Sequence, residues 1–170
     1  MSMTTSTRYT LISSDTHAGA NHKTYREYLD PKFHADFDAW RDKYKNPWKD
    51  LRDTDLRVRN WDNDRRDADQ HADGVVGEVV FPNTVPPFYP GFVLFAGPPK
   101  PEDYAHRRAG LQAHNHWLVD FCASRPGTRA GIGRSFSTTS TTRSKTRRGS
   151  RNTGCAVGCS SPTSRPMSSG

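Results

Sequence analysis

The sequence has 170 residues, a formal net charge of +7 and 32% hydrophobic residues. This length suits one domain and excludes a complete eight-stranded α/β barrel, which needs roughly 250 residues. No apolar run reaches the ~20 residues of a membrane-spanning helix. Residues 1–8 lack the apolar core of a signal peptide, and we expect them to be a disordered leader. Three unevenly spaced cysteines do not indicate a disulfide framework, which favours a cytoplasmic location.

The first predicted element is a strand at residues 9–14, which is short and rich in β-forming residues. Asp15 and His17 follow it, and alternation along a strand places them on the same face as Leu11 and Ser13. A carboxylate and an imidazole at the C-terminal end of a parallel strand are suited to bind a divalent cation. The alternative is that Asp15 caps the next helix and His17 is a surface residue of a loop.

Two helices are predicted within an insertion at residues 21–61. Aromatic and leucine side chains recur there at helical spacing, first up to Leu29 and then from Phe33 to Trp40. The insertion either covers the site or contacts a neighbouring chain, or it is a solvated excursion that a few aromatic residues hold in place.

A charged helix is predicted at residues 62–73, with Gly74 as its C-terminal cap. Residues 75–81 then form a second, largely buried strand, which completes a right-handed β-α-β unit with the first strand. The loop at 85–101 is rich in proline, glycine and aromatic residues. We expect it at the same end of the sheet as Asp15, where such loops shape substrate pockets.

The longest predicted helix spans residues 102–124, where apolar residues recur every three or four positions. Three histidines on it, His106, His114 and His116, are candidate metal ligands by residue type. A helix that packs outside a sheet directs its side chains away from the site, so we assign these histidines a structural role. A third strand begins within residues 129–133.

With these elements placed, five segments between residues 8 and 133 resemble the N-terminal part of the amidohydrolase-related family. This branch of the amidohydrolase superfamily includes aminocarboxymuconate-semialdehyde decarboxylase and γ-resorcylate decarboxylase. The segments occur in the family's order and are far more specific than the Asp-x-His pair alone. They are Ile12–His17, Arg59–Asp62, Ala72–Thr84, Ala113–Cys122 and Arg129–Gly133.

The resemblance implies an α/β chain whose residues 9–133 form the N-terminal portion of a metal-dependent (β/α)8 barrel, with about three strands. Asp15 and His17 would be the first-strand ligands of one divalent metal ion, zinc or manganese. Asn83 would line the substrate pocket. The metal would activate water for hydrolysis or hold a carboxylated substrate that loses CO2. The implied enzyme is a hydrolase or a non-oxidative decarboxylase acting on a small carboxylated or cyclic substrate.

The chain also departs from the family's pattern. The family's other metal ligands, a His near the middle strands and an Asp on the last strand, have no counterpart here, and no catalytic residue can be assigned. A catalytic zinc normally has three protein ligands. Three strands would leave an open edge and an uncovered apolar face. We therefore expect a truncated fragment with little or no activity alone, which a second copy of the chain could stabilise by covering the open edge.

The last segment, residues 134–170, holds the whole net charge, with six Arg, one Lys and no Asp or Glu. It also contains ten Ser and seven Thr. One interpretation is a disordered basic arm, attached to a small α/β binding module, that binds nucleic acid non-specifically. Cys155 and Cys159 do not indicate a zinc site, because no second pair follows. No platform of interleaved aromatic residues supports binding to single strands.

The interpretation we favour is translation of residues 134–170 in a shifted reading frame. If each codon is read one base earlier, serine codons of the form TCN become xTC and encode Phe, Leu, Ile or Val. Threonine codons become xAC and encode Asp, Asn, His or Tyr. Suitable codon choices then give a strand end, an amphipathic helix, a glycine and another buried strand, which resemble the family's continuation. Loss of one nucleotide at Gly133–Arg134 is sufficient to produce this shift. In this interpretation residues 134–170 bind nothing specific, and the protein's partner is a small-molecule substrate, with no specific nucleic acid and no membrane.

Overall fold

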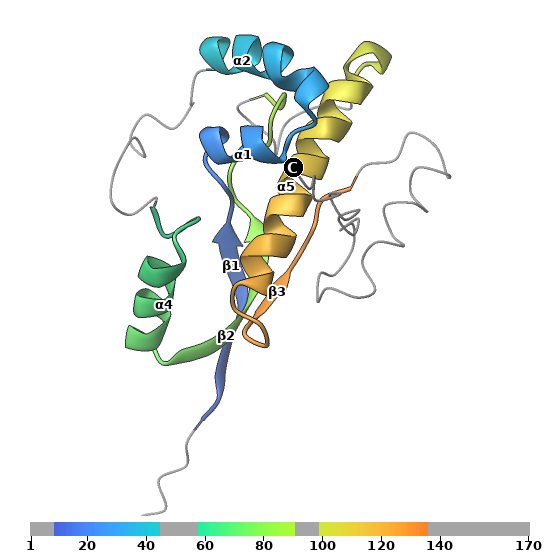
Figure 1. Cartoon of the computed structure of the whole chain (residues 1–170). Coiled ribbons are helices and arrows are strands. Elements are labelled where there is room, and N and C mark those ends of the chain that lie inside the picture. The colour runs from blue at the N-terminus through green and yellow to red at the C-terminus, as the bar shows by residue number, and fades with distance from the viewer. Residues whose placement is uncertain (1–8, 45–57, 91–98, 136–170) are drawn as a thin grey trace, which may run out of the picture.

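The computed structural model describes residues 9–44, 58–90 and 99–135. The leader expected at 1–8, and all of the basic segment after residue 135, lie outside these ranges. Within them, three parallel strands form one sheet in the order β1-β2-β3, and the sheet does not close (Figure 1). The mixed α/β class predicted from the sequence is therefore confirmed.

Strand β1 spans Leu11–Ala18 and pairs in parallel with β2, Val75–Pro82. The predicted end of the first strand at residue 14 is wrong, because the pairing continues through His17, opposite Phe81. β1 thus stays extended through the Asp-x-His segment, with Thr16 and His17 paired to β2.

An irregularity in the pairing lies at the start of this segment and includes Asp15. Ser13 pairs with Glu78 and Thr16 with Val80, so three steps along β1 oppose two along β2. An extra residue of this kind is a bulge, and it interrupts the alternation of side chains. The single face predicted for Leu11, Ser13, Asp15 and His17 is therefore interrupted between Ser13 and Thr16.

Helices α1, His22–Tyr28, and α2, His34–Lys43, confirm the two helices predicted in the insertion. A short 3-10 turn, Pro31–Phe33, joins them. The side chain of Asn21 accepts a hydrogen bond from the backbone N–H of Thr24 at 2.9 Å, so Asn21 is the N-terminal cap of α1. The alternative role of Asp15 as the cap of the next helix is therefore wrong.

Helix α4, Asn63–Ala72, begins at a cap formed by Asp62, whose carboxylate accepts from the N–H of Arg65 at 2.9 Å. The helix ends at Ala72, and two residues later Gly74 has a φ of +71°, a conformation that glycine adopts without the strain of a Cβ. Both ends agree with the sequence prediction.

The prediction that β2 is largely buried is wrong. Within it only Glu78 and Val80 are buried, and Val76 is 57% exposed. Residues two apart on a strand share a face, and Glu78 and Val80 contact side chains of the helical layer. The strand is half-buried because the described helices cover one face of the sheet and leave the other open.

Helix α5, Tyr104–Ala123, follows a 3-10 turn at Pro101–Asp103 and packs along the sheet, and β3, Arg129–Gly131, follows it (Figure 1). Both elements were predicted. The core forms where α5 meets α1 and the sheet. Its buried members are Ala18, Ala20, Tyr25, Val80, Trp117, Leu118, Val119, Phe121 and Cys122. A second cluster, Leu29, Phe37, Ala109 and Ala113, joins α2 to the start of α5.

Candidate metal site

Asp15 and His17 lie together near the C-terminal end of β1. Oδ1 of Asp15 is 3.3 Å from Nε2 of His17, and the two side chains are 80% and 52% exposed. Thr16, between them, contacts Glu78 on the helix-covered face. Because neighbouring residues on a strand point to opposite faces, Asp15 and His17 lie on the open face. The expectation that these two side chains share a face is confirmed.

Asn83 lies beside this pair, directly after β2. Its backbone N–H donates to the carbonyl of Ala18 at 3.0 Å, and its side-chain Nδ2 donates to Oδ1 of Asn60 at 2.8 Å. The carbonyl of Asn60 in turn accepts from the N–H of Gly19 at 3.0 Å. These contacts join the end of β1, the end of β2 and Asn60, which precedes α4 by three positions. Together they form one exposed polar rim.

Gly19 is required where β1 leaves the sheet. A Cβ built on Gly19 would lie 2.2 Å from Oγ1 of Thr84. Only a residue without a side chain lets β1 pass this close to the loop after β2, so Gly19 helps to bring the two strand ends together.

The donor atoms at this rim fit a divalent cation, but they are two in number. Carboxylate oxygen and imidazole nitrogen are both ligands of zinc, and imidazole and carboxylate also suit manganese. Over residues 9–44, 58–90 and 99–135, no group of three His, Cys, Asp or Glu side chains is placed to hold a metal ion. The described part of the chain therefore offers two candidate donor side chains here, whereas a catalytic zinc normally has three protein ligands.

The three histidines of α5 do not join Asp15 and His17 in such a group. Nε2 of His106 lies 2.8 Å from the carboxylate of Asp36 on α2. Burial lowers the pKa of His116. His114 is fully buried, and its Nδ1 is 2.7 Å from the hydroxyl of Tyr25.

His114 is expected to make the fold less stable in acid. Burial, with a smaller contribution from the charge of Arg134, lowers the pKa of His114 from 6.5 to about 3. Between these values the unfolded chain binds a proton at this residue and the folded chain does not. The free energy of unfolding should therefore fall by about 1.4 kcal/mol per pH unit as the pH drops below 6.5.

His114→Gln removes this contribution and keeps a polar atom for Tyr25. Urea unfolding of both proteins between pH 7.5 and 4.5 checks it. The wild-type protein should lose more stability than the variant as the pH falls. Parallel curves would show that His114 protonates as easily in the folded chain as in the unfolded one.

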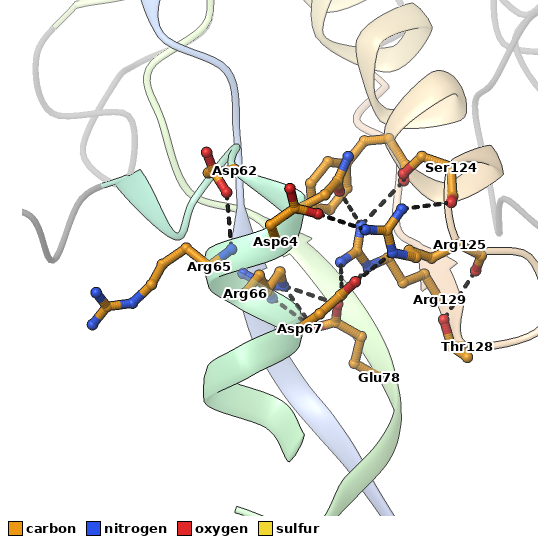
Figure 2. Close-up of polar contacts among 12 residues, drawn as sticks. Asp62, Asp64, Arg65, Arg66, Asp67, Glu78, Ser124, Arg125, Thr128 and Arg129 are labelled. Atoms are coloured by element: carbon orange, nitrogen blue, oxygen red, sulfur yellow. Dashed lines mark hydrogen bonds and ion pairs between the residues drawn. The ribbon is translucent and has the colours of Figure 1, made fainter. Parts of the chain in front are cut away.

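An ion cluster on the helix-covered face was not predicted (Figure 2). The buried carboxylate of Glu78 accepts from Arg66 on α4, with Nη2–Oε2 at 2.6 Å, and from Arg129 on β3, with Nε–Oε1 at 3.0 Å. Asp67 accepts from Arg129 at 2.8 Å and also binds Arg125. The cluster joins α4, β2, β3 and the end of α5. The sequence signal for it was Glu78 itself, an isolated carboxylate within an apolar strand.

The cluster keeps Glu78 ionised. Burial alone would raise the pKa of Glu78, but hydrogen bonds from Arg66 and Thr16 and the charge of Arg66 bring it below the ordinary value. Burial lowers the pKa of Arg129, while the charges of Glu78 and Asp67 oppose this shift.

Comparison of the chain with protein-family models, curated proteins and solved structures finds no match. The site must therefore be interpreted from its own residues. Among the described helices, none is both long and apolar enough to cross a membrane.

Proposed function

We propose that the chain forms the N-terminal portion of a metal-dependent barrel enzyme similar to the amidohydrolase-related family. Asp15 and His17 would be its first two metal ligands. The observation that supports this most directly is their geometry. A carboxylate oxygen and an imidazole nitrogen lie 3.3 Å apart, both exposed, on the open face of a parallel sheet.

The position of the pair within the fold also supports the proposal. In parallel α/β proteins, binding and catalytic groups gather at the C-terminal ends of the strands. Asp15 and His17 lie near that end of β1, and Asn83 follows that end of β2. Further strands paired to the free edges would turn the open face into the interior of a barrel.

Each of these residues has a role in the proposed site. Asp15 and His17 would hold one divalent ion, zinc or manganese. The bound ion would supply either an activated water for hydrolysis or a positive charge that holds a substrate carboxylate during decarboxylation. Asn60 fixes the amide of Asn83, which would bind a polar group of a small carboxylated or cyclic substrate. The enzyme would act in the cytoplasm.

The proposal has a consequence for the chain as it stands. Catalytic zinc sites usually take three protein ligands, and the described ranges offer two. We therefore expect the 170-residue chain to bind a cation weakly and to turn over little or no substrate.

The test is titration of the full chain with Mn²⁺, followed by the electron paramagnetic resonance signal of the free ion. Manganese prefers oxygen and nitrogen ligands, so the cysteines of the chain interfere less than they would with zinc. Asp15→Asn and His17→Gln should each weaken binding more than ~10-fold, because each removes one of two protein ligands.

The chain offers a matched control for this test. Asp36 and His106 form another carboxylate–imidazole pair, with Oδ2 2.8 Å from Nε2. His106→Gln should leave Mn²⁺ binding unchanged, because this pair lies between α2 and α5, outside the polar rim. Equal losses in His17→Gln and His106→Gln would mean that Mn²⁺ binds histidines non-specifically and that Asp15 and His17 are not a metal site.

A further inference from the structure

The backbone that carries Asp15 and His17 is fixed from the opposite face of the sheet. Oγ1 of Thr16, the residue between them, lies 2.7 Å from Oε2 of Glu78 and 2.9 Å from the carbonyl oxygen of Val79. Both are acceptors, so the single hydroxyl proton of Thr16 can go to either. The side chain at the centre of the Asp-x-His segment is thus bound to the neighbouring strand.

Arg66 makes a second attachment at the same place. Its Nη1 donates to the backbone carbonyl of His17 at 3.0 Å, while its Nε donates to Oε1 of Glu78 at 2.9 Å. One guanidinium therefore joins the carbonyl of the proposed ligand to the carboxylate that also contacts Thr16. Glu78 is in turn held by Arg129, and its side chain is fully buried (Figure 2).

The irregular pairing of β1 explains why such attachments matter here. The bulge between Ser13 and Thr16 includes Asp15, so the ladder is interrupted at the first of the two proposed ligands. The contact of Thr16 with Glu78 follows directly after it and fixes the register in which Asp15 and His17 emerge. Both of these side chains are largely exposed, so packing does little to restrict their rotamers.

We propose that Thr16, Glu78 and Arg66 are positioning residues that hold Asp15 and His17 in the geometry needed to bind a cation. This inference rests on the proposed function of that pair. Groups behind metal ligands commonly change metal affinity 10- to 100-fold through orientation alone. Here the orienting groups act through the backbone of residues 16 and 17, from the face that the helices cover.

Substitutions at Thr16 test the proposal. Thr16→Val keeps the shape of the side chain and removes the hydroxyl, and Thr16→Ser keeps the hydroxyl. We expect Mn²⁺ binding about 10-fold weaker in Thr16→Val and close to wild type in Thr16→Ser. Thr128→Val is the matched control, because it removes a hydroxyl that donates to the carbonyl of Arg125, at the far end of α5. It should leave Mn²⁺ binding unchanged.

A second measurement needs no metal and separates this proposal from the proposed function. Three-bond couplings between the amide proton and Hα report whether the backbone of Asp15, Thr16 and His17 holds one extended conformation. We expect the couplings of a single extended backbone in the wild-type chain and in Thr16→Ser, and averaged couplings in Thr16→Val. Arg66→Lys, which keeps the charge but loses the fork that joins Glu78 to His17, should also average them.

These outcomes are distinguishable. If the wild-type chain binds no Mn²⁺, the proposed function is wrong, and the couplings alone decide whether the positioning occurs. If Thr16→Val and Arg66→Lys are folded by circular dichroism and match wild type in both couplings and affinity, the positioning role is overturned. Loss of affinity in Thr16→Ser equal to that in Thr16→Val would also overturn it, because the hydroxyl would not be the cause.

Discussion

Replacing Glu78 by alanine is expected to lower the free energy of unfolding by about 3–5 kcal/mol, the usual cost of removing one partner of a buried ion pair. The side chain of Glu78 is fully buried, and those of Arg66 and Arg129 are 8% and 1% exposed. Without the carboxylate of Glu78, the buried guanidinium of Arg66 keeps backbone carbonyls but no carboxylate among the described residues, and that of Arg129 is left with Asp67, which Arg125 also binds. Urea unfolding followed by circular dichroism measures the change.

Asp64→Ala is the control for this experiment. Asp64 accepts from Nη2 of Arg125 at 3.1 Å, but its side chain is 98% exposed, and exposed ion pairs contribute little to stability. We expect no resolvable change in this variant. A similar loss in Glu78→Ala and Asp64→Ala would mean that the buried position of Glu78 adds nothing to the cluster.

The pH dependence of the Glu78 contribution has a definite sign. Because the folded chain lowers the pKa of Glu78, this residue stabilises the fold fully above its ordinary pKa of 4.5. The contribution is lost as the pH falls below that value. The difference in stability between wild type and Glu78→Gln should therefore shrink in acid.

Local patterns were sufficient to predict the regular elements. The helical spacing of apolar residues over 102–124 corresponds to α5, and Gly74 follows the end of α4 as expected. These signals depend on residues three or four positions apart. The end of β1 could not be predicted in this way, because its extension through His17 depends on pairing with Phe81, 64 positions later.

The candidate site was predictable to a similar extent. The period of two along a strand was enough to bring Asp15 and His17 together. The attachment of Thr16 was not predictable, because Glu78 lies 62 positions away. An isolated Glu within an apolar strand does require a cationic partner. Its actual partners, Arg66 and Arg129, come from two other elements. They could not be predicted, because the sequence contains 25 Lys and Arg residues and no local pattern selects these two.

The backbone of Arg134 is hydrogen-bonded to the rest of the fold, whereas one nitrogen of its side chain is buried without a partner among the described residues. The N–H of Arg134 donates to Oδ1 of Asn115 at 2.9 Å, and Nδ2 of Asn115 donates to the carbonyl of Arg134 at 2.8 Å. In contrast, Nη1 of Arg134 is buried with no hydrogen-bond partner in the described part of the chain. Burial lowers the pKa of Arg134, and the groups that oppose this shift are the phenols of Tyr25 and Tyr89.

This misfit falls at the position where the shifted reading frame would begin. Arg134 is half-buried, and a guanidinium nitrogen that is buried without a hydrogen-bond partner is costly, whereas a neutral amide has fewer donors to satisfy. The shifted frame allows Gln in place of Arg134. The unpartnered Nη1 of Arg134 thus lies directly at the Gly133–Arg134 junction, although Oδ2 of Asp69 and Nε2 of His114, which precede it, are also buried without a partner in the described part of the chain.

Insertion of one base at the Gly133–Arg134 junction is therefore expected to turn a weak cation binder into an active enzyme. The restored chain should continue with new strands and should supply a downstream His and Asp. We expect it to bind one Mn²⁺ or Zn²⁺ per chain, far more tightly than the 170-residue chain, and to hydrolyse or decarboxylate small carboxylated substrates. Asp15→Asn in the restored chain should abolish both properties.

Sequencing the gene across the codons for residues 130–139 and beyond the codon for Gly170 comes first. A long open frame after the inserted base, with His and Asp codons downstream, agrees with the shifted frame. An early stop codon in that frame would contradict it, and residues 134–170 would then be a genuine basic segment. In that case salt-sensitive binding to nucleic acid, lost on removal of residues 134–170, would be the expected property. An open shifted frame would make the positive charge of the chain an accident of translation. An early stop in that frame would make the same charge part of a binding surface.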